Sequence, residues 1–148
     1  MPNNIRSLAL DMLARREHSC FELKQKLLAK GFDRDQIDQE LRNLANQKLQ
    51  SDERFTESYV NMRIRKGFGP IKIALELRER GIAKEEVEKF LSLYKNDWVA
   101  KAKQLAEKKF GQDTPKNTHE LAKLIRYLAG KGFTNDQIRE ALKYDQNY

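Results

Sequence analysis

Residues 27–37 read LLAKGFDRDQI, and the pattern returns as LRERGIAKEEV at residues 77–87 and as LAGKGFTNDQI at residues 128–138. In each copy an apolar residue lies four positions before a glycine, a second follows the glycine directly, and two more lie six and ten positions after it. Recurrence at a period of about fifty residues indicates one supersecondary unit used three times, because neighbouring units bury the faces that a single unit leaves exposed. The chain is therefore modular.

The three glycines of this repeat mark the ends of helices. Apolar residues recur at helical spacing along almost the whole chain, and no segment alternates convincingly with period two. Gly31, Gly81 and Gly132 each follow such a helical stretch, and glycine enters the left-handed conformation after a helix without a steric penalty at Cβ. The core of each unit is therefore predicted to be a helix, a glycine turn and a second helix.

Polar residues mark where several helices begin. Three pairs have the capping-box spacing, in which two side chains satisfy free backbone donors reciprocally. They are Ser19 with Glu22, Asp33 with Gln36, and Thr134 with Gln137. Pro70 fits the first turn of another helix, where its missing N–H costs nothing. Ala83 stands at the corresponding position of the middle unit and cannot cap, so Glu85 and Glu86 are expected to compensate in part through the helix dipole.

These signals predict an all-α fold of three tandem three-helix repeats, which are helix-turn-helix-like and form an elongated modular array. The third repeat carries a polar insertion, Gly111 to Thr118, between its first two helices. The first helix of each repeat is placed at Ile5–Arg16, Phe55–Arg65 and Trp98–Phe110, which gives about nine helices in all. We expect one domain per repeat, with the boundaries 1–49, 50–95 and 96–148.

The charge balance favours an anionic partner without specifying one. The 148 residues include 29 Lys and Arg against 22 Asp and Glu, a net charge of +7, and residues 101–148 carry ten basic and six acidic side chains. Cys20 is the single cysteine, nothing at the amino terminus resembles a secretory signal, and no apolar run approaches the roughly 20 residues of a membrane-spanning helix. We expect a soluble monomer in a reducing cytoplasm, with no membrane contact.

No set of residues in the sequence supports catalysis or a cofactor. Gly130-Lys131-Gly132 lacks the upstream glycine and the Ser or Thr of a phosphate-binding loop. Gly67-Phe68-Gly69 runs into Pro70 without completing a dinucleotide fingerprint. His18 and His119 lie in unrelated polar segments of a chain with one cysteine, so a metal set or a nucleophilic triad lacks parts. We therefore predict no catalytic residue, no metal and no cofactor.

The distribution of charge bears on what the chain binds. A helix after a glycine turn can enter the major groove of DNA, but residues 33–40 and 85–88 are acidic and phosphates repel such faces. The basic residues gather instead around the first two helices of each repeat, and they form a basic stripe if those faces align. We interpret the crowded Arg63, Arg65 and Lys66 as a contact site, because their repulsion is costly without an anion or an acidic partner.

Three strings give the chain a specific resemblance that covers essentially its full length. They are Leu13-Ala14-Arg15-Arg16-Glu17-His18-Ser19, Asp52-Glu53-Arg54-Phe55 and Arg65-Lys66-Gly67-Phe68-Gly69-Pro70. Together with the threefold repeat, they resemble the RecX family of bacterial recombination regulators, although the third repeat lacks an Asp-x-Arg-Phe string. The resemblance implies a non-enzymatic protein that binds the RecA recombinase, chiefly as its filament on single-stranded DNA. It also implies inhibition of the ATPase, strand exchange and coprotease activities in homologous recombination, DNA repair and the SOS response.

Charge and resemblance together select the expected contact residues, which lie mostly in the middle repeat. They are Arg15, Arg16, Arg54, Arg63, Arg65, Lys66, Lys72, Arg78, Lys101, Lys108 and Arg126. Of these, Arg54 could equally support the core. The residues expected to shape turns are Gly31, Gly67, Gly69, Pro70, Gly81 and Gly132. Single-stranded and double-stranded DNA are further candidate partners, and the alternative interpretation is a free-standing nucleic-acid-binding helical module that acts by DNA binding alone.

Overall fold

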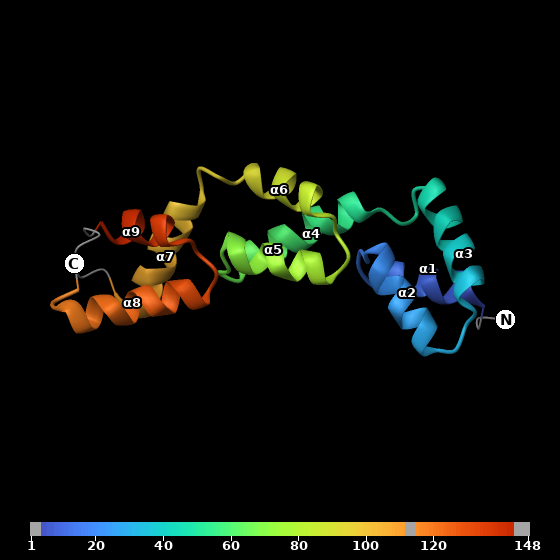
Figure 1. Ribbon diagram of the computed structural model, residues 1–148, viewed down its shortest axis with the longest axis horizontal. Coiled ribbons are helices and arrows are strands. Elements are labelled where there is room, and N and C mark those ends of the chain that lie inside the picture. Colours follow the sequence, from blue (N-terminus) through green and yellow to red (C-terminus); the bar gives the residue numbers. More distant parts are fainter. Residues whose placement is uncertain (1–3, 112–114, 144–148) are drawn as a thin grey trace. The chain divides into compact units, whose positions relative to one another are not determined.

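The computed structural model describes residues 4–111 and 115–143, and every regular element within these ranges is an α-helix. In chain order they are α1 Ile5–Arg15, α2 Cys20–Ala29, α3 Arg34–Asn46, α4 Asp52–Arg65, α5 Pro70–Glu79, α6 Lys84–Ser92, α7 Trp98–Phe110, α8 Thr118–Gly130 and α9 Asn135–Leu142 (Figure 1). The predicted all-α fold is confirmed for this part of the chain. Residues 112–114 of the polar insertion lie outside the described residues. No helix in the described part is long and apolar enough to cross a bilayer.

The predicted capping positions each open a helix. The Ser19 and Thr134 side chains accept a hydrogen bond from the backbone N–H three residues on, and the side chain at that position accepts one from the cap, so both capping boxes are complete. The Asp33 side chain accepts the equivalent backbone bond at the start of α3. Asn4 and Asn117 cap α1 and α8 in the same way, although no cap was predicted at either position.

Two helix boundaries differ from the predicted ones. α4 begins at Asp52, three residues before the predicted Phe55, because the hydroxyl of Ser51 accepts a hydrogen bond from the Arg54 N–H at 3.1 Å and caps the helix there. α1 ends at Arg15, since the backbone of Arg16 is already extended. Serine caps without a Glu or Gln three residues later are hard to find by pattern, which explains the first difference.

The cap at Thr134 has a measurable contribution to stability. Replacing Thr134 by alanine removes the hydroxyl that accepts the Gln137 N–H, so we expect the free energy of unfolding to fall by about 1 kcal/mol. Urea unfolding followed by circular dichroism measures this loss. Asn135→Ala changes the exposed neighbour without touching the cap and is the control. Equal losses for the two variants would contradict the role of the Thr134 hydroxyl.

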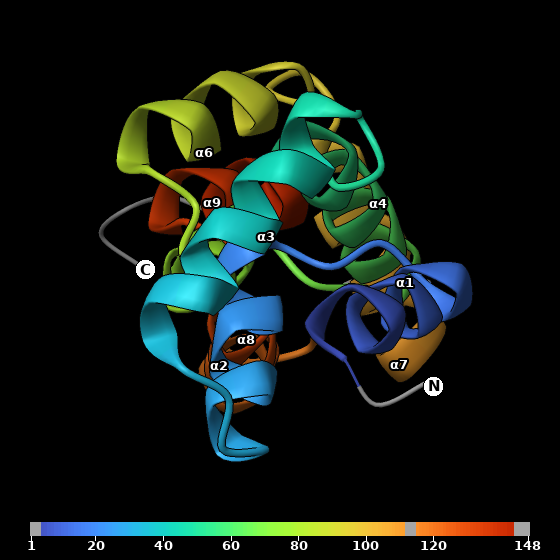
Figure 2. The same cartoon turned by 90° about the vertical axis from the view of Figure 1, so that its right-hand side faces the viewer.

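Helices α1, α2 and α3 pack into a bundle at the amino-terminal end of the chain (Figure 2). Its buried core is supplied by the apolar positions of the repeat pattern together with one residue of α1. The core residues are Ala9, Leu23, Leu27, Ile37, Leu41 and Leu44. Each has at most 2% of its surface exposed, and burial of this kind of side chain contributes roughly 1.5–3 kcal/mol for each large aliphatic residue.

Helices α7, α8 and α9 form a second bundle, in which α7 lies against both α8 and α9. The Trp98 ring at the start of α7 meets the Phe133 ring edge-on, with centroids 6.5 Å apart, and both residues are buried. Further buried residues come from all three helices: Ala102, Ala106, Leu121, Leu124, Leu128, Ile138 and Ala141. Phe133 is the residue directly after the repeat glycine, so the repeat pattern again supplies a core position.

By backbone contacts, the chain forms two compact units rather than three. One contains α1 to α3, the first part of α4 up to Tyr59, and residues 77–87; we call it the first unit. The other contains residues 60–76 and the chain from Glu88 onward, and we call it the second unit. The helices of the middle repeat thus contribute to both units. The domain boundaries after residues 49 and 95 stay a prediction.

The helix ends fall at the predicted glycines. Gly31, Gly81 and Gly132 have φ angles of +92°, +85° and +101°, in the left-handed region, and Pro70 is the first residue of α5. The backbone N–H of Phe133 donates to the carbonyl of Leu128, five residues earlier, which closes the last turn of α8. The glycine turns are therefore confirmed as helix ends.

In the second unit, the turn at Gly132 also packs on the start of α5. The Gly69 N–H donates to the Lys131 carbonyl at 2.7 Å, and the Ile71 N–H donates to the Gly132 carbonyl at 2.8 Å. A Cβ at Gly69 would lie 2.6 Å from the carbonyl carbon of Gly132, and a Cβ at Gly132 would lie 2.5 Å from the Lys72 Cβ. The two backbones can approach this closely only because both positions are glycine.

An equivalent contact lies in the first unit, between the turn at Gly81 and the start of α2. The Ser19 hydroxyl donates to the Arg80 carbonyl at 2.8 Å, and a Cβ at Gly81 would lie 2.4 Å from the Cβ of Phe21. The glycine turn of one repeat therefore contacts the beginning of a helix in the preceding repeat. Gly31 belongs to the first repeat and has no atom within 4 Å of such a Cβ.

Candidate functional site

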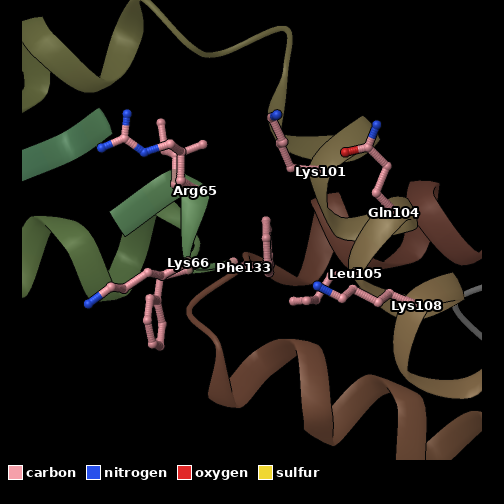
Figure 3. A pocket seen from close by; sticks show the side chains of 10 residues that line it. Arg65, Lys66, Lys101, Gln104, Leu105, Lys108 and Phe133 are labelled. Carbon is pink, nitrogen blue, oxygen red and sulfur yellow. The ribbon is translucent and has the colours of Figure 1, made fainter. Parts of the chain in front are cut away.

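A basic pocket of about 510 Å³ lies in the second unit, between the end of α4 and one face of α7. Arg65 and Lys66 line it from the α4 side, and Lys101 and Lys108 line it from α7 (Figure 3). None of the ten residues that line this pocket is acidic. In the described part of the chain, these four cations also form no ion pair, so the basic pocket carries four positive charges that no carboxylate of the pocket offsets.

The turn after α4 sets one wall of the basic pocket. The Gly67 N–H donates to the Ile64 carbonyl at 2.9 Å and the Phe68 N–H donates to the Arg63 carbonyl at 3.1 Å, which closes the helix. A Cβ at Gly67 would lie 3.1 Å from a methyl of Leu105 on α7, so the turn and α7 are in close contact. This contact places Arg65 and Lys66 beside α7.

The opposite wall is one face of α7. Lys101, Gln104, Leu105 and Lys108 line the basic pocket, and their spacing of three and four residues places them on the same side of the helix. The side chains of Leu105 and Phe133 occupy the space between the two walls in Figure 3. The Lys108 ammonium reaches into that space, while the head groups of Arg65 and Lys66 point away from α7. The basic pocket therefore has an apolar floor and a cationic rim.

Arg63 has an acidic partner that the sequence interpretation did not foresee. Its guanidinium donates two hydrogen bonds to the Glu76 carboxylate, at 2.8 and 2.7 Å, and both side chains are only 16% exposed. The guanidinium carbon also lies 3.7 Å from the centre of the Phe68 ring. Glu76 is thus the acidic partner that offsets the charge of Arg63, and Arg63 does not line the basic pocket. The ion pair joins α4 to α5.

Two other predicted contact residues already hold partners within their own unit. Arg16 donates to both carboxylate oxygens of Glu22, at 3.1 and 3.2 Å. Arg54 donates to Glu17 at 3.1 Å and to the Lys48 carbonyl at 2.9 Å, which joins the start of α4 to the segment after α1. Exposed pairs of this kind contribute about 0–1 kcal/mol each, so neither arginine is strongly held.

The remaining predicted contact residues are dispersed over the structure. The Lys72 ammonium lies 5.0 Å from the centre of the Phe68 ring, and the Lys131 ammonium lies 4.7 Å from the same centre. Arg78 is exposed and donates to the Ile82 carbonyl at 3.3 Å, and Arg126 is exposed on α8. None of Lys72, Arg78 and Arg126 lines the basic pocket. The structure therefore gathers four of the predicted contact residues and leaves the others apart.

A second basic pocket, of about 480 Å³, lies in the first unit between α1 and α2. We call it the first-unit pocket. Arg15 lines it together with Lys26 and Lys30, while Leu8, Met12 and Ala29 supply apolar surface and Asp11 one carboxylate. Of its cations the sequence predicted Arg15 alone. The positions of Lys26 and Lys30, four residues apart on one side of α2, were the available signal.

His18 has a structural arrangement rather than a catalytic one. It is 3% exposed; its Nδ1 lies 3.1 Å from the Arg16 carbonyl and its Nε2 3.1 Å from the Lys26 ammonium. The two contacts indicate a neutral imidazole that donates from Nδ1 and accepts at Nε2. Burial lowers the pKa of His18 below its usual value, and the positive charges of Arg16 and Lys26 lower it further, although the bond to the Arg16 carbonyl acts in the opposite direction.

The lowered pKa of His18 predicts a loss of stability in mild acid. The unfolded chain binds a proton at His18 more readily than the folded one. The contribution of neutral His18 to the free energy of unfolding should therefore be fully present above about pH 6.5 and be lost as the pH falls through the folded-state pKa. One such group changes the unfolding free energy by at most about 1.4 kcal/mol per pH unit. Urea unfolding at pH 7.5 and pH 5 should show a smaller decline for His18→Gln than for the wild type. The control His119→Gln, at an exposed position of α8, should decline as the wild type does.

Family models match all three repeats. Residues 6–43 match the first three-helix domain of RecX, residues 51–91 the second and residues 95–142 the third. The regulatory protein RecX of Halorhodospira halophila is 39% identical over 137 residues, which cover 93% of this chain and 85% of that protein. The regulatory protein RecX of Pseudomonas savastanoi pv. phaseolicola is 37% identical over 141 residues, 95% of this chain and 91% of that protein.

Solved structures show the same fold. The crystal structure of RecX from Lactobacillus salivarius superposes with a TM-score of 0.82 at 28% identity, covering 94% of this chain and 92% of that one. These findings define a class of all-helical proteins built from three tandem three-helix domains. The chain belongs to the RecX family of regulatory proteins, as its repeated phrase and its central strings predicted.

Proposed function

We propose that this chain is a non-enzymatic regulator that binds the RecA recombinase, chiefly its filament on single-stranded DNA. In this proposal it inhibits the ATPase, strand exchange and coprotease activities of the filament and so modulates recombination, DNA repair and the SOS response. It works in the cytoplasm as a monomer. Membership of the RecX family supports the regulatory role. The observation that carries the contact site is the basic pocket, where four of the eleven predicted contact residues lie together without a carboxylate.

The basic pocket suits an anionic partner for a physical reason. Four cations around a partly apolar concavity raise the local positive potential, which speeds encounter with an acidic surface and strengthens binding where water is displaced. Inhibition needs more than binding, because a ligand with equal affinity for active and inactive filament shifts neither population. The bound chain must therefore favour an inactive filament, obstruct an incoming duplex or stop growth at a filament end.

A titration distinguishes this function from the alternative of DNA binding alone. The full chain is added to preformed RecA filaments on single-stranded DNA while ATP hydrolysis is followed, and the series is repeated at several excesses of free DNA. We expect inhibition below one chain per recombinase protomer that added DNA leaves unchanged. Inhibition that disappears with excess DNA and with rising salt would favour the nucleic-acid-binding module. Unaltered ATP hydrolysis at every ratio would overturn the regulatory proposal.

A further inference from the structure

The basic pocket and the first-unit pocket have the same chemistry. Their volumes are about 510 and 480 Å³, and each combines aliphatic surface with three or more cations. In the basic pocket the aliphatic surface comes from Leu105 and Ile64, and in the first-unit pocket from Leu8 and Met12. Volumes of this size fall within the range of pockets that bind a ligand, so each can take up side chains of a bound segment. The two units therefore offer two sites suited to one kind of ligand.

The aromatic residues of the pockets argue against a nucleic acid strand as that ligand. Single strands bind by stacking their bases on exposed aromatic faces. Phe133 is only 2% exposed, and the Phe68 ring is already contacted by the guanidinium of Arg63 at 3.7 Å and the ammonium of Lys131 at 4.7 Å. The first-unit pocket is lined by no aromatic residue. Neither pocket therefore provides a free platform for a base.

The polar residues favour separate carboxylates over a continuous row of phosphates. Asp11 lines the first-unit pocket beside its three cations and would repel a phosphate backbone laid along it. An acidic protein segment can place its carboxylates near Arg15 and Lys30 and leave Asp11 without a close anion. The aliphatic surfaces would meanwhile cover one apolar side chain, which releases water and adds affinity.

We propose that each pocket holds an acidic protein segment with one apolar anchor residue. The anchor lies on the aliphatic floor, and the carboxylates beside it pair with the rim, Arg65, Lys66, Lys101 and Lys108 in the basic pocket. This inference rests on the proposed function, because a partner built of repeating subunits presents the same segment more than once. The first-unit pocket then becomes a second site for a second copy of that segment.

Because one chain has two sites, a partner with two such segments should bind with a higher apparent affinity than a partner with one. Once the first segment is bound, the second is held at a high effective concentration, so the apparent affinity rises by about 10²-fold or more. Each site alone stays weak, because a few exposed ion pairs and one buried anchor supply limited free energy. Loss of either pocket should therefore reduce a tandem ligand to the affinity of a single one.

Fluorescence anisotropy with three labelled probes tests the proposal on the full chain. The probes are a twelve-residue peptide of Glu and Asp around a central Leu, the same peptide in tandem through a Gly and Ser linker, and oligothymidylate of matched charge. We expect the single peptide to bind more tightly than the oligothymidylate, and the tandem peptide about 10²-fold more tightly than the single one. Tighter binding of the oligothymidylate, or equal affinities for the single and tandem peptides, would overturn the proposal.

Paired charge reversals locate the two sites. Lys101→Glu with Lys108→Glu should abolish the extra affinity of the tandem peptide over the single peptide. Arg15→Glu with Lys30→Glu should do the same through the first-unit pocket. The matched controls are Lys103→Glu with Lys123→Glu, and Arg34→Glu with Arg42→Glu, which reverse as many exposed charges outside the pockets. Leu105→Ser should weaken the single peptide, while Leu105→Met restores the apolar contact. If the control variants lost the extra affinity of the tandem peptide as completely as the pocket variants, the two pockets would not be the binding sites.

The peptide results and the filament results can disagree, and each disagreement has one meaning. Filament inhibition without peptide binding would overturn the acidic-segment inference and leave the proposed function standing. Tight, tandem-enhanced peptide binding without any effect on filaments would overturn the proposed function and leave the chemistry of the pockets standing. Circular dichroism of every variant at the binding temperature separates loss of binding from loss of folding.

Discussion

Gly132→Ala is expected to lower the free energy of unfolding by about 3 kcal/mol. Two independent costs contribute to this value. The φ angle of +101° disfavours any residue with a Cβ, and that Cβ would lie 2.5 Å from the Lys72 Cβ and 2.7 Å from the Lys72 backbone nitrogen. Relief requires movement of backbone, because two hydrogen bonds fix the turn to the start of α5. Urea unfolding of the full chain measures the loss.

Two glycines of the same chain serve as matched controls for this substitution. Gly31 has a similar φ of +92° but open space around it, so Gly31→Ala should show the conformational cost alone, about 1 kcal/mol. Gly130 closes α8 at a negative φ with nothing within 4 Å, so Gly130→Ala should be neutral or slightly stabilising. If Gly132→Ala cost no more than Gly31→Ala, the close approach between the turn and α5 would not contribute to stability.

Lys101→Glu combined with Lys108→Glu is expected to raise the concentration needed for filament inhibition at least about tenfold. The two substitutions reverse both α7 charges of the basic pocket while Arg65 and Lys66 remain, which converts a uniformly positive rim into a mixed one. Both side chains are exposed, so the helix and its buried face should fold unchanged. The measurement is RecA ATP hydrolysis on single-stranded DNA against the concentration of each variant.

The control for net charge uses lysines of the same unit that lie outside the basic pocket. Lys103→Glu with Lys123→Glu changes the overall charge equally and should leave the inhibitory concentration within about twofold, since both side chains are exposed to screening solvent and neither lines the basic pocket. If both double variants reduced inhibition equally, the net charge of the chain, and not the basic pocket, would determine inhibition.

Replacing Arg63 is expected to lower stability, whereas replacing Arg65 or Lys66 is expected to weaken the contact with the partner. Neutralising Arg63 removes the two hydrogen bonds to Glu76, which are largely shielded from water, so Arg63→Gln should cost about 2 kcal/mol of stability. A variant that combines Arg63 with Arg65 and Lys66 would therefore mix a loss of folding with a loss of contact. Arg65 and Lys66 alone test the contact.

The helices of this chain could be predicted from the sequence because their signals are local. A capping side chain such as Thr134, a glycine such as Gly132 and apolar residues at helical spacing each act within one turn of the backbone. Where the local signal was weaker, as at Ser51, the boundary moved by three residues and the helix itself remained. The family was also predictable, since its strings are contiguous in sequence.

The candidate site was predictable residue by residue but not as a site. Periodicity indicates that Lys101 and Lys108 share one face of α7, and it indicates nothing about which other face they meet. Arg65 and Lys66 reach that face through the contact of Gly67 with Leu105, residues 38 positions apart. The charge of Arg63 looked equivalent to theirs in sequence, yet Glu76 on the next helix pairs with it.

The sequence by itself therefore determined the helices, their ends, the threefold repeat and the family, because each rests on interactions within a few residues or on contiguous strings. Only the tertiary structure showed which cations line the basic pocket and which are paired with a carboxylate of the protein itself. It also showed that Gly69 and Gly132, predicted as turn residues, are the surfaces where two repeats approach within van der Waals contact. Packing between distant segments decides these matters, and such packing depends on the shapes of whole faces rather than on any single position.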